Sequence, residues 1–434
     1  MPDDTHRLAP GGGSVASTSA LVVALWLTVV VQCISLALVS GRYDYFHMYF
    51  NWSDPFFVAT SVVIFSALSI LFVVAEFSFG YVIGFTFFII VMNFTWLSYR
   101  SRFDYDHAMV IVLVVSSFLL FLMPALLFGS RRRIRWTLPS SWFPVLLVVL
   151  TAIIGAVLVV AATYNFRVVG LGSIYEFRNE VIFPTALNYS VNVVINALAP
   201  YVFACWIERR NYICALCIVL LLLAFYPVTL SKGALFAPFW LVVLTLVMRE
   251  GSPRLRFVAV YLAVVAIGVV AAFVQSGVAI SYFGAVNFRL LAIPASVIEH
   301  YIDYFQTRPN TGLCHVGFMQ QFLKCLSVDQ LSVVMNNHYN LGNQNGSFLA
   351  TEGVAAFGYY FMPIAALLCG AIVGLGNVAS AGLSARFVLL SGGMMPLVMN
   401  NVPMSTTLFT GGYLVLILLW MISPRMQDVL VEAR

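Results

Sequence analysis

The sequence predicts an all-α polytopic membrane protein with roughly twelve transmembrane helices and one large helical extracytoplasmic loop. Hydrophobic residues make up 62% of the chain, against about 45–50% in soluble domains. The mean hydropathy is +0.96, and only 9% of residues are charged. Apolar runs of about 20 residues, the length that crosses a bilayer, recur along the chain. Residues 1–434 are therefore expected to form a single membrane-embedded domain.

The apolar runs give the expected order of elements. Residues 1–18, with three successive glycines, are expected to form a disordered N-terminal tail. The first apolar run is too long for a signal-peptide core, so we expect it to be a retained span. The expected spans lie at about 20–40, 56–75, 77–97, 108–128, 142–162, 187–207, 212–230, 234–248, 257–277, 353–376, 386–401 and 405–422.

Basic residues predict the orientation of these spans. The strongest basic cluster is Arg131, Arg132, Arg133 and Arg135. If both termini are cytoplasmic, 13 of the 22 lysines and arginines lie on the side of this cluster, although the loops on the other side contain far more residues. The extracytoplasmic face then carries four loops, at about 41–55, 98–107, 163–186 and 278–352. The net charge of +5 is explained by this orientation, so the sequence predicts no nucleic-acid partner.

The large loop, 278–352, concentrates polar residues in a chain that has few of them. It contains Arg289, Glu299, Asp303, Arg308, His315, Lys324, Asp329, His338 and Glu352. We expect this loop, lying over the ends of the membrane helices, to hold the active site. The shorter loop at 163–186, which contains Tyr175 and Arg178, is the second candidate region.

The 7 cysteines give only limited evidence. Cys214 and Cys217 form a C-x-x-C pair, but they lie within an apolar run, where buried small hydrophobes are expected. Cys314 and Cys325 share the large loop. If that loop is extracytoplasmic, they either form a disulfide or remain reduced, and the sequence does not decide between the two.

The chain lacks the motifs of nucleotide-driven chemistry. It has no G-x-x-x-x-G-K-[ST], no G-x-G-x-x-G after a strand and no H-E-x-x-H. We therefore expect a substrate that is already activated and available at the membrane, with no cofactor and no metal. The chain also lacks paired broken helices of inverted topology, which disfavours a secondary transporter.

Cations near the outer ends of the spans are candidates for phosphate binding. Arg178 and Arg289 lie in outer loops, and arginine binds phosphate with two parallel hydrogen bonds. Each could equally be an interfacial residue that extends toward the headgroups. Lys232 follows Pro227 at the tip of a helical hairpin, where an isolated cation costs at least about 2.5–3.5 kcal/mol, so a paired or a functional role is expected.

Carboxylates and one histidine are candidates for proton transfer. Glu299 and Asp303 stand four residues apart, on one face of a helix that is either solvated or functional. A helix from Asn345 to Gly376 would be about 48 Å long at 1.5 Å per residue. Its first turns would project beyond the bilayer, with Asn345 and Glu352 on one face. Glu352 could accept a proton from an attacking hydroxyl, and His338 is the second candidate base.

Several motifs resemble the Wzy-type polymerases of oligosaccharide repeat units. Residues 288–295 (FRLLAIPA) and 301–305 (YIDYF) resemble the start of the family's large periplasmic loop, and 345–353 (NGSFLATEG) with 356–358 (AFG) resembles its exit. Residues 174–178 (IYEFR) are similar to the motif after the fifth span. Residues 230–233 (LSKG) and 408–412 (LFTGG) resemble weaker patterns. The resemblance covers roughly residues 160 to 420.

The resemblance implies an inverting glycosyl transfer at the periplasmic face of the bacterial inner membrane. The donor would be a growing O-antigen or related glycan on a polyprenyl diphosphate, and the acceptor would be one repeat unit on the same carrier. Arg289 and Arg178 would bind diphosphate with help from Lys232, and Glu352 or His338 would serve the acceptor hydroxyl. Tyr301 and Tyr304 would offer stacking surfaces for sugars. Tyr175 and Asn345 would also contact substrate, and a chain-length regulator is a possible partner.

Three alternatives remain open. O-antigen ligases resemble these polymerases, but they carry a histidine just before the corresponding helix, whereas His338 precedes Asn345 by several residues; this disfavours a ligase and favours Glu352 as base. A metal-dependent glycosyltransferase would use Asp104 and Asp106, whose D-x-D spacing can hold a divalent cation and equally fits a solvated turn. A transporter that flips lipid-linked glycan is the third.

Overall fold

The computed structural model describes residues 15–50, 53–128, 136–139, 141–170, 177, 180–249, 251–274, 276–316, 323, 325, 329–346 and 348–424. Regular structure in these ranges is helical. The α-helices are α1 (Val15–Arg42), α2 (Pro55–Leu68), α3 (Leu71–Val74), α4 (Phe79–Ser98), α5 (His107–Leu127), α6 (Phe143–Tyr164), α8 (Thr185–Val193), α9 (Ala199–Glu208), α10 (Tyr212–Thr229), α11 (Lys232–Val247), α12 (Pro253–Val274), α13 (Gly277–Phe283), α14 (Ile293–Gln306), α16 (Leu331–Tyr339), α17 (Met362–Ser380), α18 (Ala385–Ser391), α19 (Met395–Asn401), α20 (Met404–Phe409) and α21 (Tyr413–Ile422). Three π-helical segments interrupt them: η2 (Val194–Leu198), η3 (Gly284–Ala292) and η4 (Leu349–Ala355).

The chain is a multi-pass α-helical membrane protein. In its described part, 10 helices are long and apolar enough to cross a membrane, and two shorter apolar helices are α11 and α21. The figure of about twelve spans and the sidedness of the loops remain predictions. Residues 15–18, expected in the N-terminal tail, form the first turn of α1 instead.

Helix α4 is the centre of the bundle. Every residue of α4 except Thr86 is buried, because α5, α14 and α17 all pack against it. A helix that is apolar on every face is stable only when neighbours cover every face. The structure therefore holds the loop-derived helix α14 directly against the most buried span.

The most extensive helix pair is α5 with α17. Two glycines of α17 permit their close approach. A Cβ atom at Gly370 would lie 2.3 Å from the carbonyl oxygen of Phe121, and one at Gly374 would lie 2.8 Å from that of Pro124. Small residues at such positions let helix backbones approach and gain packing contacts inside a membrane.

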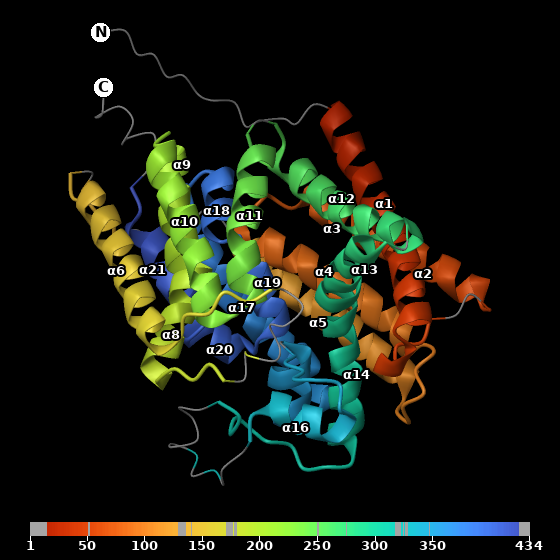
Figure 1. Ribbon diagram of the computed structural model, residues 1–434. Helices are drawn as coiled ribbons and strands as arrows, with labels where there is room; N and C mark the ends of the chain where they lie inside the picture. The colour runs from red at the N-terminus through yellow and green to blue at the C-terminus, as the bar shows by residue number, and fades with distance from the viewer. Residues whose placement is uncertain are drawn as a thin grey trace.

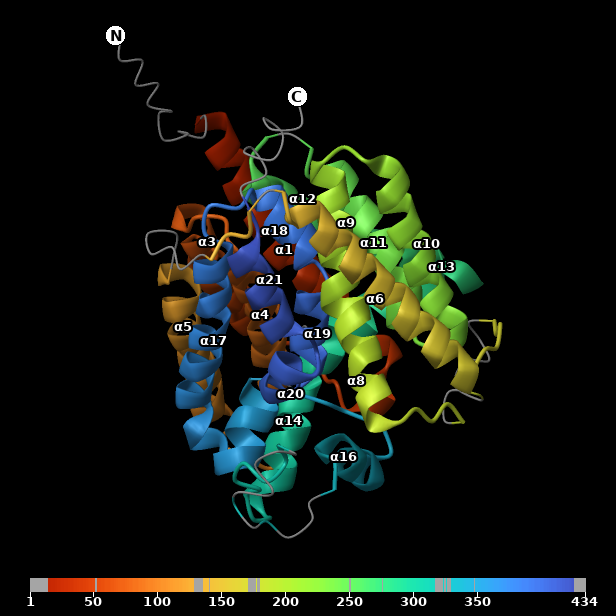
Figure 2. The same ribbon diagram turned by 90° about the vertical axis from the view of Figure 1, so that its left-hand side faces the viewer.

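The two ends of the bundle differ in character (Figures 1 and 2). The described parts of the loops at 41–55, 98–107 and 163–186 lie at one end, together with the end of α14 and with α16, and we call this the loop end; α13, at the start of the 278–352 segment, lies beside α12 at mid-height. The start of α1, the α9–α10 turn and the start of α12 lie at the opposite end. This arrangement agrees with the grouping of loops that the basic residues predicted.

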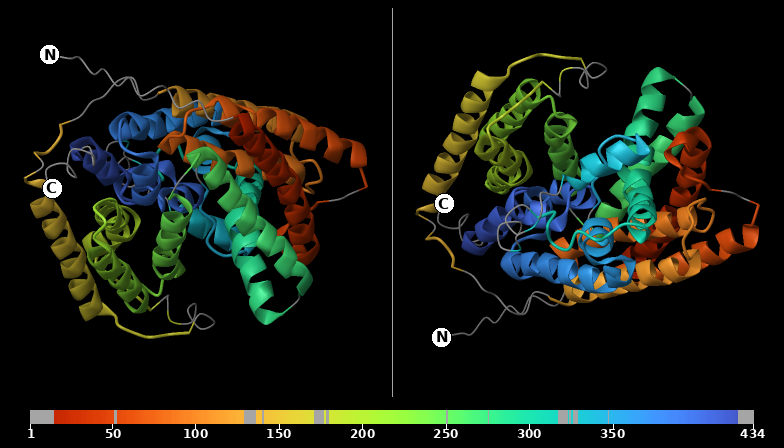
Figure 3. Two further views of the ribbon diagram at one scale, coloured as in Figure 1. Left: turned by 90° about the horizontal axis from the view of Figure 1, so that it is seen from above. Right: turned by 90° about the horizontal axis from the view of Figure 1, so that it is seen from below.

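The first third of the expected large loop is helical. Elements α13, η3 and α14 form one apolar helical stretch, Gly277–Gln306, which packs on α12, α1 and α4. Figure 3 shows α12 and α13 meeting at an outer corner of the bundle, where Phe273, Val274 and Val278 are exposed. Such apolar side chains suit contact with lipid tails, so residues 278–306 belong to the helical body as well as to the loop.

The last two expected spans are both broken. The span at 386–401 consists of α18 and α19, separated at Gly392 and Gly393. The span at 405–422 consists of α20 and α21, separated at Gly412, whose φ is +93°. Because of these breaks, the short helix α20 lies at the loop end, close to η4.

Candidate active site at the loop end

Glu352 is the centre of the candidate site. It lies on the π-helical segment η4, and its side chain is partly buried. One carboxylate oxygen, Oε2, accepts a hydrogen bond from Thr351 Oγ1 at 2.6 Å. The other, Oε1, accepts from the backbone N–H of Ser405 at 3.3 Å. The carboxylate therefore joins the large loop to the start of α20, and π-helical turns occur often at functional sites.

Burial controls the protonation of Glu352. Burial raises the pKa of its carboxyl above the ordinary value, and the hydrogen bonds from Thr351 and Ser405 partly oppose that rise. A carboxylate with a raised pKa is a stronger base than an exposed one, and a pKa nearer the working pH suits proton transfer. The geometry thus fits a general base better than a simple anionic surface residue.

Two breaks in the backbone shape the segment that carries Glu352. Phe348 has φ +54° and Gly358 has φ +92°. The stretch 342–346 before η4 is not helical. The continuous helix expected from Asn345 to Gly376 is therefore wrong. Asn345 is exposed on the non-helical stretch before η4, so it does not share a helix face with Glu352. Only α17 continues the long span.

Segment 310–311 fixes η4 from outside. Asn310 Nδ2 donates to the carbonyl of Val354 at 2.9 Å. The backbone N–H of Thr311 donates to the carbonyl of Ala355 at 2.8 Å. Because the helix breaks at Gly358, the Ala355 carbonyl has no N–H donor within the helix, and Thr311 supplies one.

A few residues further along the chain, Cys314 and Cys325 form a disulfide, so of the two alternatives left open by the sequence the structure shows the oxidised one.

Arg289 is exposed on η3, at the loop end. The polar side chains beneath it hold this π-helical segment in place. Asn93 of α4 donates its amide to the carbonyl of Leu291 at 2.8 Å. Asn287 donates to Ser35 Oγ of α1 at 2.8 Å and to the Val265 carbonyl at 3.1 Å. These buried bonds fix the segment from which Arg289 projects.

His338 and Tyr304 form a second group with Arg308. The imidazole of exposed His338 lies edge-on to the Tyr304 ring, with centroids 5.2 Å apart. The guanidinium of Arg308 lies 4.0 Å from the centroid of the same ring. An aromatic ring beside a cation and an imidazole is suited to contact a sugar and its charged groups. The two candidate bases therefore lie in different surroundings: His338 is exposed and contacts Tyr304, whereas the Glu352 carboxylate is bonded to the start of α20.

Tyr301 does not offer a surface for sugar stacking, contrary to expectation. Its side chain is completely buried, and its hydroxyl donates to the carbonyl of Gln344 at 3.2 Å. The role of Tyr301 is to hold the extended stretch before η4 against α14.

The α10–α11 hairpin carries Lys232 as the first residue of α11. The tip is bound to the start of the second loop. The backbone N–H of Arg167 donates to the Pro227 carbonyl at 2.9 Å, and the hydroxyl of Tyr226 donates to the Val169 carbonyl at 2.5 Å. Lys232 therefore lies on α11, whereas Arg289 lies on η3, so the two cations project from separate elements. Tyr175 and Arg178 lie outside the residues that the structure describes.

A buried polar cluster on α14 was not predicted. Glu299 was expected on a helix face that is either solvated or functional; it is not solvated, because it is completely buried and accepts from the hydroxyl of Tyr105 at 2.9 Å. His300 is also buried, with Nδ1 2.7 Å from Gln344 Oε1. The sequence signal was the spacing of Glu299 and Asp303. That spacing shows that the two side chains share a helix face, but not whether the face is buried or exposed to solvent.

Asp303 lies at the edge of this cluster and accepts from Tyr339 Oη at 2.5 Å. Burial, and then the bond to Asp303, raise the pKa of the Tyr339 phenol, which therefore stays protonated and donates. The cluster joins α14 to α16 and to the loop before α5.

The potential metal ligands are the acidic, histidine and cysteine side chains. The described residues contain no group of three or more of these side chains that could hold an ion. Asp106 accepts from the backbone N–H of Met109 at 3.0 Å and thereby caps α5. Of the two D-x-D carboxylates, Asp106 is thus explained by its helix-capping role.

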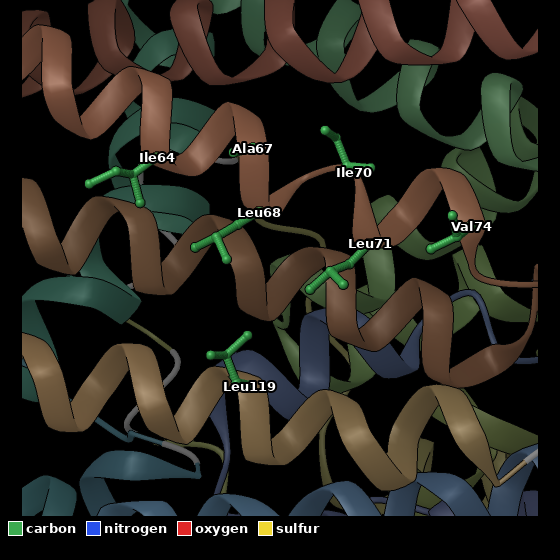
Figure 4. Close-up of a pocket in the computed structure, with 7 residues that line it drawn as sticks. All are labelled: Ile64, Ala67, Leu68, Ile70, Leu71, Val74 and Leu119. Carbon is green, nitrogen blue, oxygen red and sulfur yellow. The ribbon is translucent and has the colours of Figure 1, made fainter.

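Two hollows in the described part of the structure lie away from these residues. One, of about 480 Å³, is lined by apolar side chains of α2, α3 and α5, including Leu68, Leu71 and Leu119 (Figure 4). The other lies at the end opposite the loops. Neither is lined by Glu352, Arg289 or Lys232, so the expected common hollow of cations is not among them.

Comparison with protein-family models finds no match for the chain, and neither does comparison with curated proteins or with solved structures.

Proposed function

We propose that the protein is a glycosyltransferase that joins polyprenyl-diphosphate-linked repeat units into a surface polysaccharide at its loop end. The observation that carries this proposal is the Glu352 carboxylate, held between Thr351 and Ser405 with a pKa raised by burial. The motif resemblance around residues 345–353 gives the reaction class. The arrangement of Glu352 supplies the base that this reaction needs.

In the proposed step, an acceptor sugar hydroxyl gives its proton to Glu352. Its oxygen forms a bond to the anomeric carbon of the donor glycan, while the bond from that carbon to the diphosphate oxygen breaks. The polyprenyl diphosphate leaves with the electron pair, so attack from the opposite face inverts the configuration. Arg289 would offset the charge that develops on the leaving group. Lys232 projects from a separate element and Arg178 lies outside the described residues, so the proposed step depends on neither of them.

The remaining loop-end residues would orient the acceptor. Exposed His338 and Arg308, with the half-buried ring of Tyr304, form the group best suited to contact its sugars. Such positioning by groups remote from the reacting bond can contribute much of the rate enhancement. A chain-length regulator would be the expected protein partner.

The disulfide supports a periplasmic location for the loop end. Disulfides form and persist in oxidising compartments such as the bacterial periplasm. Cys314 and Cys325 lie in the large loop. The proposal therefore places catalysis at the periplasmic face of the inner membrane, where repeat units carried on polyprenyl diphosphate are available without a nucleotide.

The test is the glycan ladder of cells that carry Arg289→Ala. We expect single-repeat glycan in place of long chains, because the leaving diphosphate loses its cation. Arg102→Ala is the matched control, since Arg102 is an exposed loop-end arginine that stacks on Tyr49, 4.2 Å away. A normal ladder from Arg289→Ala at normal protein level rejects the proposed role of Arg289.

A further inference from the structure

The second hollow, at the end opposite the loops, is basic. Its volume is about 200 Å³, and it lies where the α11–α12 turn meets the start of α18. Arg249, Arg256 and Arg386 line it. We infer that this hollow binds the phosphate of an anionic phospholipid headgroup, a role independent of the glycosyl transfer proposed above.

Arg256 is fixed in position across the α11–α12 turn. Its Nη1 donates to the Val247 carbonyl at 2.7 Å, at the end of α11. Gly251, with φ +92°, permits this placement, because a Cβ atom there would lie only 3.1 Å from Nη2 of Arg256. The guanidinium is therefore pre-organised, which reduces the entropy lost when it binds an anion.

The other two arginines leave the hollow positive. Arg386 Nε lies 3.8 Å from Glu208 Oε1, which offsets part of one charge, and the Arg386 side chain is 29% exposed. Arg249 is exposed. Glu250, next to it in sequence, lies outside the described residues. Among the described residues, three arginines therefore line the hollow, and one of them, Arg386, lies near a carboxylate.

Other arginines at this end are engaged by the protein itself. Arg254 Nη1 donates to the carbonyl of Ala75 at 3.1 Å, and it also bonds to that of Val73. The guanidinium of Arg209 lies 5.1 Å from the ring centroid of Phe143. Contacts within the protein therefore explain why these two arginines lie at this end. Arg249, Arg256 and Arg386 differ from them because they line one hollow at the ends of membrane helices, and basic pockets in that position bind phospholipid headgroups.

The test is native mass spectrometry of the full chain with phosphatidylglycerol or with phosphatidylcholine of the same acyl chains. Wild type should retain phosphatidylglycerol preferentially. Arg249→Gln with Arg256→Gln should lower its retention roughly tenfold or more, since each basic residue near a membrane surface contributes about 1 kcal/mol. Arg42→Gln with Arg102→Gln, the same charge change at the loop end, should leave retention unchanged.

Three results would contradict the inference. They are equal retention of the two lipids by wild type, undiminished retention by the double variant, and displacement of the lipid by millimolar inorganic phosphate, which would assign the hollow to a free anion. If the double variant fails to fold, Arg249→Gln alone, on an exposed side chain, should still lower retention by roughly fivefold.

Discussion

Asn310 Nδ2 donates a hydrogen bond to the backbone carbonyl of Val354 at 2.9 Å, and this bond joins the chain beyond α14 to the π-helical segment that carries Glu352. The same carbonyl also accepts from the backbone N–H of Gly358 at 2.9 Å. The placement of Glu352 thus depends on residues some forty positions earlier in the chain, and not on η4 alone.

The variant Asn310→Ala tests this brace. It should lower the free energy of unfolding by about 1 kcal/mol, the net value of one hydrogen bond, because Val354 keeps its bond from Gly358. The transfer rate should also fall, since η4 is less firmly held. Denaturant titration in detergent measures the first effect. Asn337→Ala, at an exposed position on α16, is the control and should change neither.

Glu352→Gln should slow glycosyl transfer by roughly 10²–10⁴-fold, the range expected when a general base is lost. The amide can still accept from Ser405, so the fold should persist. Glu352→Asp, which keeps the carboxylate one carbon shorter, should retain part of the rate. A Glu352→Gln protein that is well folded and fully active would remove Glu352 from catalysis.

The pH dependence of stability offers an independent check of Glu352. Because burial raises its pKa, the folded state holds the proton more tightly than the unfolded chain does. The stabilisation is complete below the ordinary glutamate pKa of about 4.3 and is lost as pH rises through the raised value. Activity should increase over the same range, since the deprotonated form is the base. Unfolding curves of wild type and Glu352→Gln that change identically with pH would argue against a raised pKa.

Gly268 tests the support beneath Arg289. A Cβ atom at Gly268 would lie 1.7 Å from Asn287 Oδ1, and Asn287 is buried and bonded to Ser35. Gly268→Ala should therefore displace Asn287 and destabilise the protein by about 1–3 kcal/mol, the usual cost of overpacking. Gly155→Ala is the matched control, because nothing lies within 4 Å of its added atom. Equal melting temperatures for the two variants would contradict this packing.

The disulfide tests the orientation of the loop end. Mass spectrometry of the alkylated, non-reduced protein should find Cys314 linked to Cys325, and Cys369 reduced. In cells without their periplasmic thiol oxidant the link should be lost. Its persistence there would contradict a periplasmic loop. Replacing both cysteines with serine should cost about 2–4 kcal/mol of stability.

The sequence predicted the parts of the fold that depend on hydropathy. Long apolar runs identified the membrane helices, and basic residues grouped the loops at one end. It did not predict the breaks at Gly358, Gly392 and Gly412, because glycine within an apolar run is also tolerated in intact membrane helices. The helix expected from Asn345 is wrong both for this reason and because the stretch 342–346 and Phe348 are not helical.

The roles of the site residues remain predictions. Glu352 was singled out because it was expected on the first turns of a helix that begins near Asn345; the structure instead carries it on η4, after a non-helical stretch. The burial of Tyr301 and Glu299 could not be predicted, since helical spacing tells which residues share a face but not what covers it. The contacts of Glu352 with Ser405 and of Asn93 with Leu291 join segments far apart in sequence, and no local pattern reveals them.

The most direct measurement of the central claim is polymer formation in proteoliposomes that contain the purified protein and polyprenyl-diphosphate-linked repeat units. We predict that wild type makes a ladder of chain lengths and releases polyprenyl diphosphate, whereas Glu352→Gln leaves single repeats. A ladder from Glu352→Gln at the wild-type rate, or movement of the lipid-linked glycan across the bilayer by wild type with no polymer, would contradict the account.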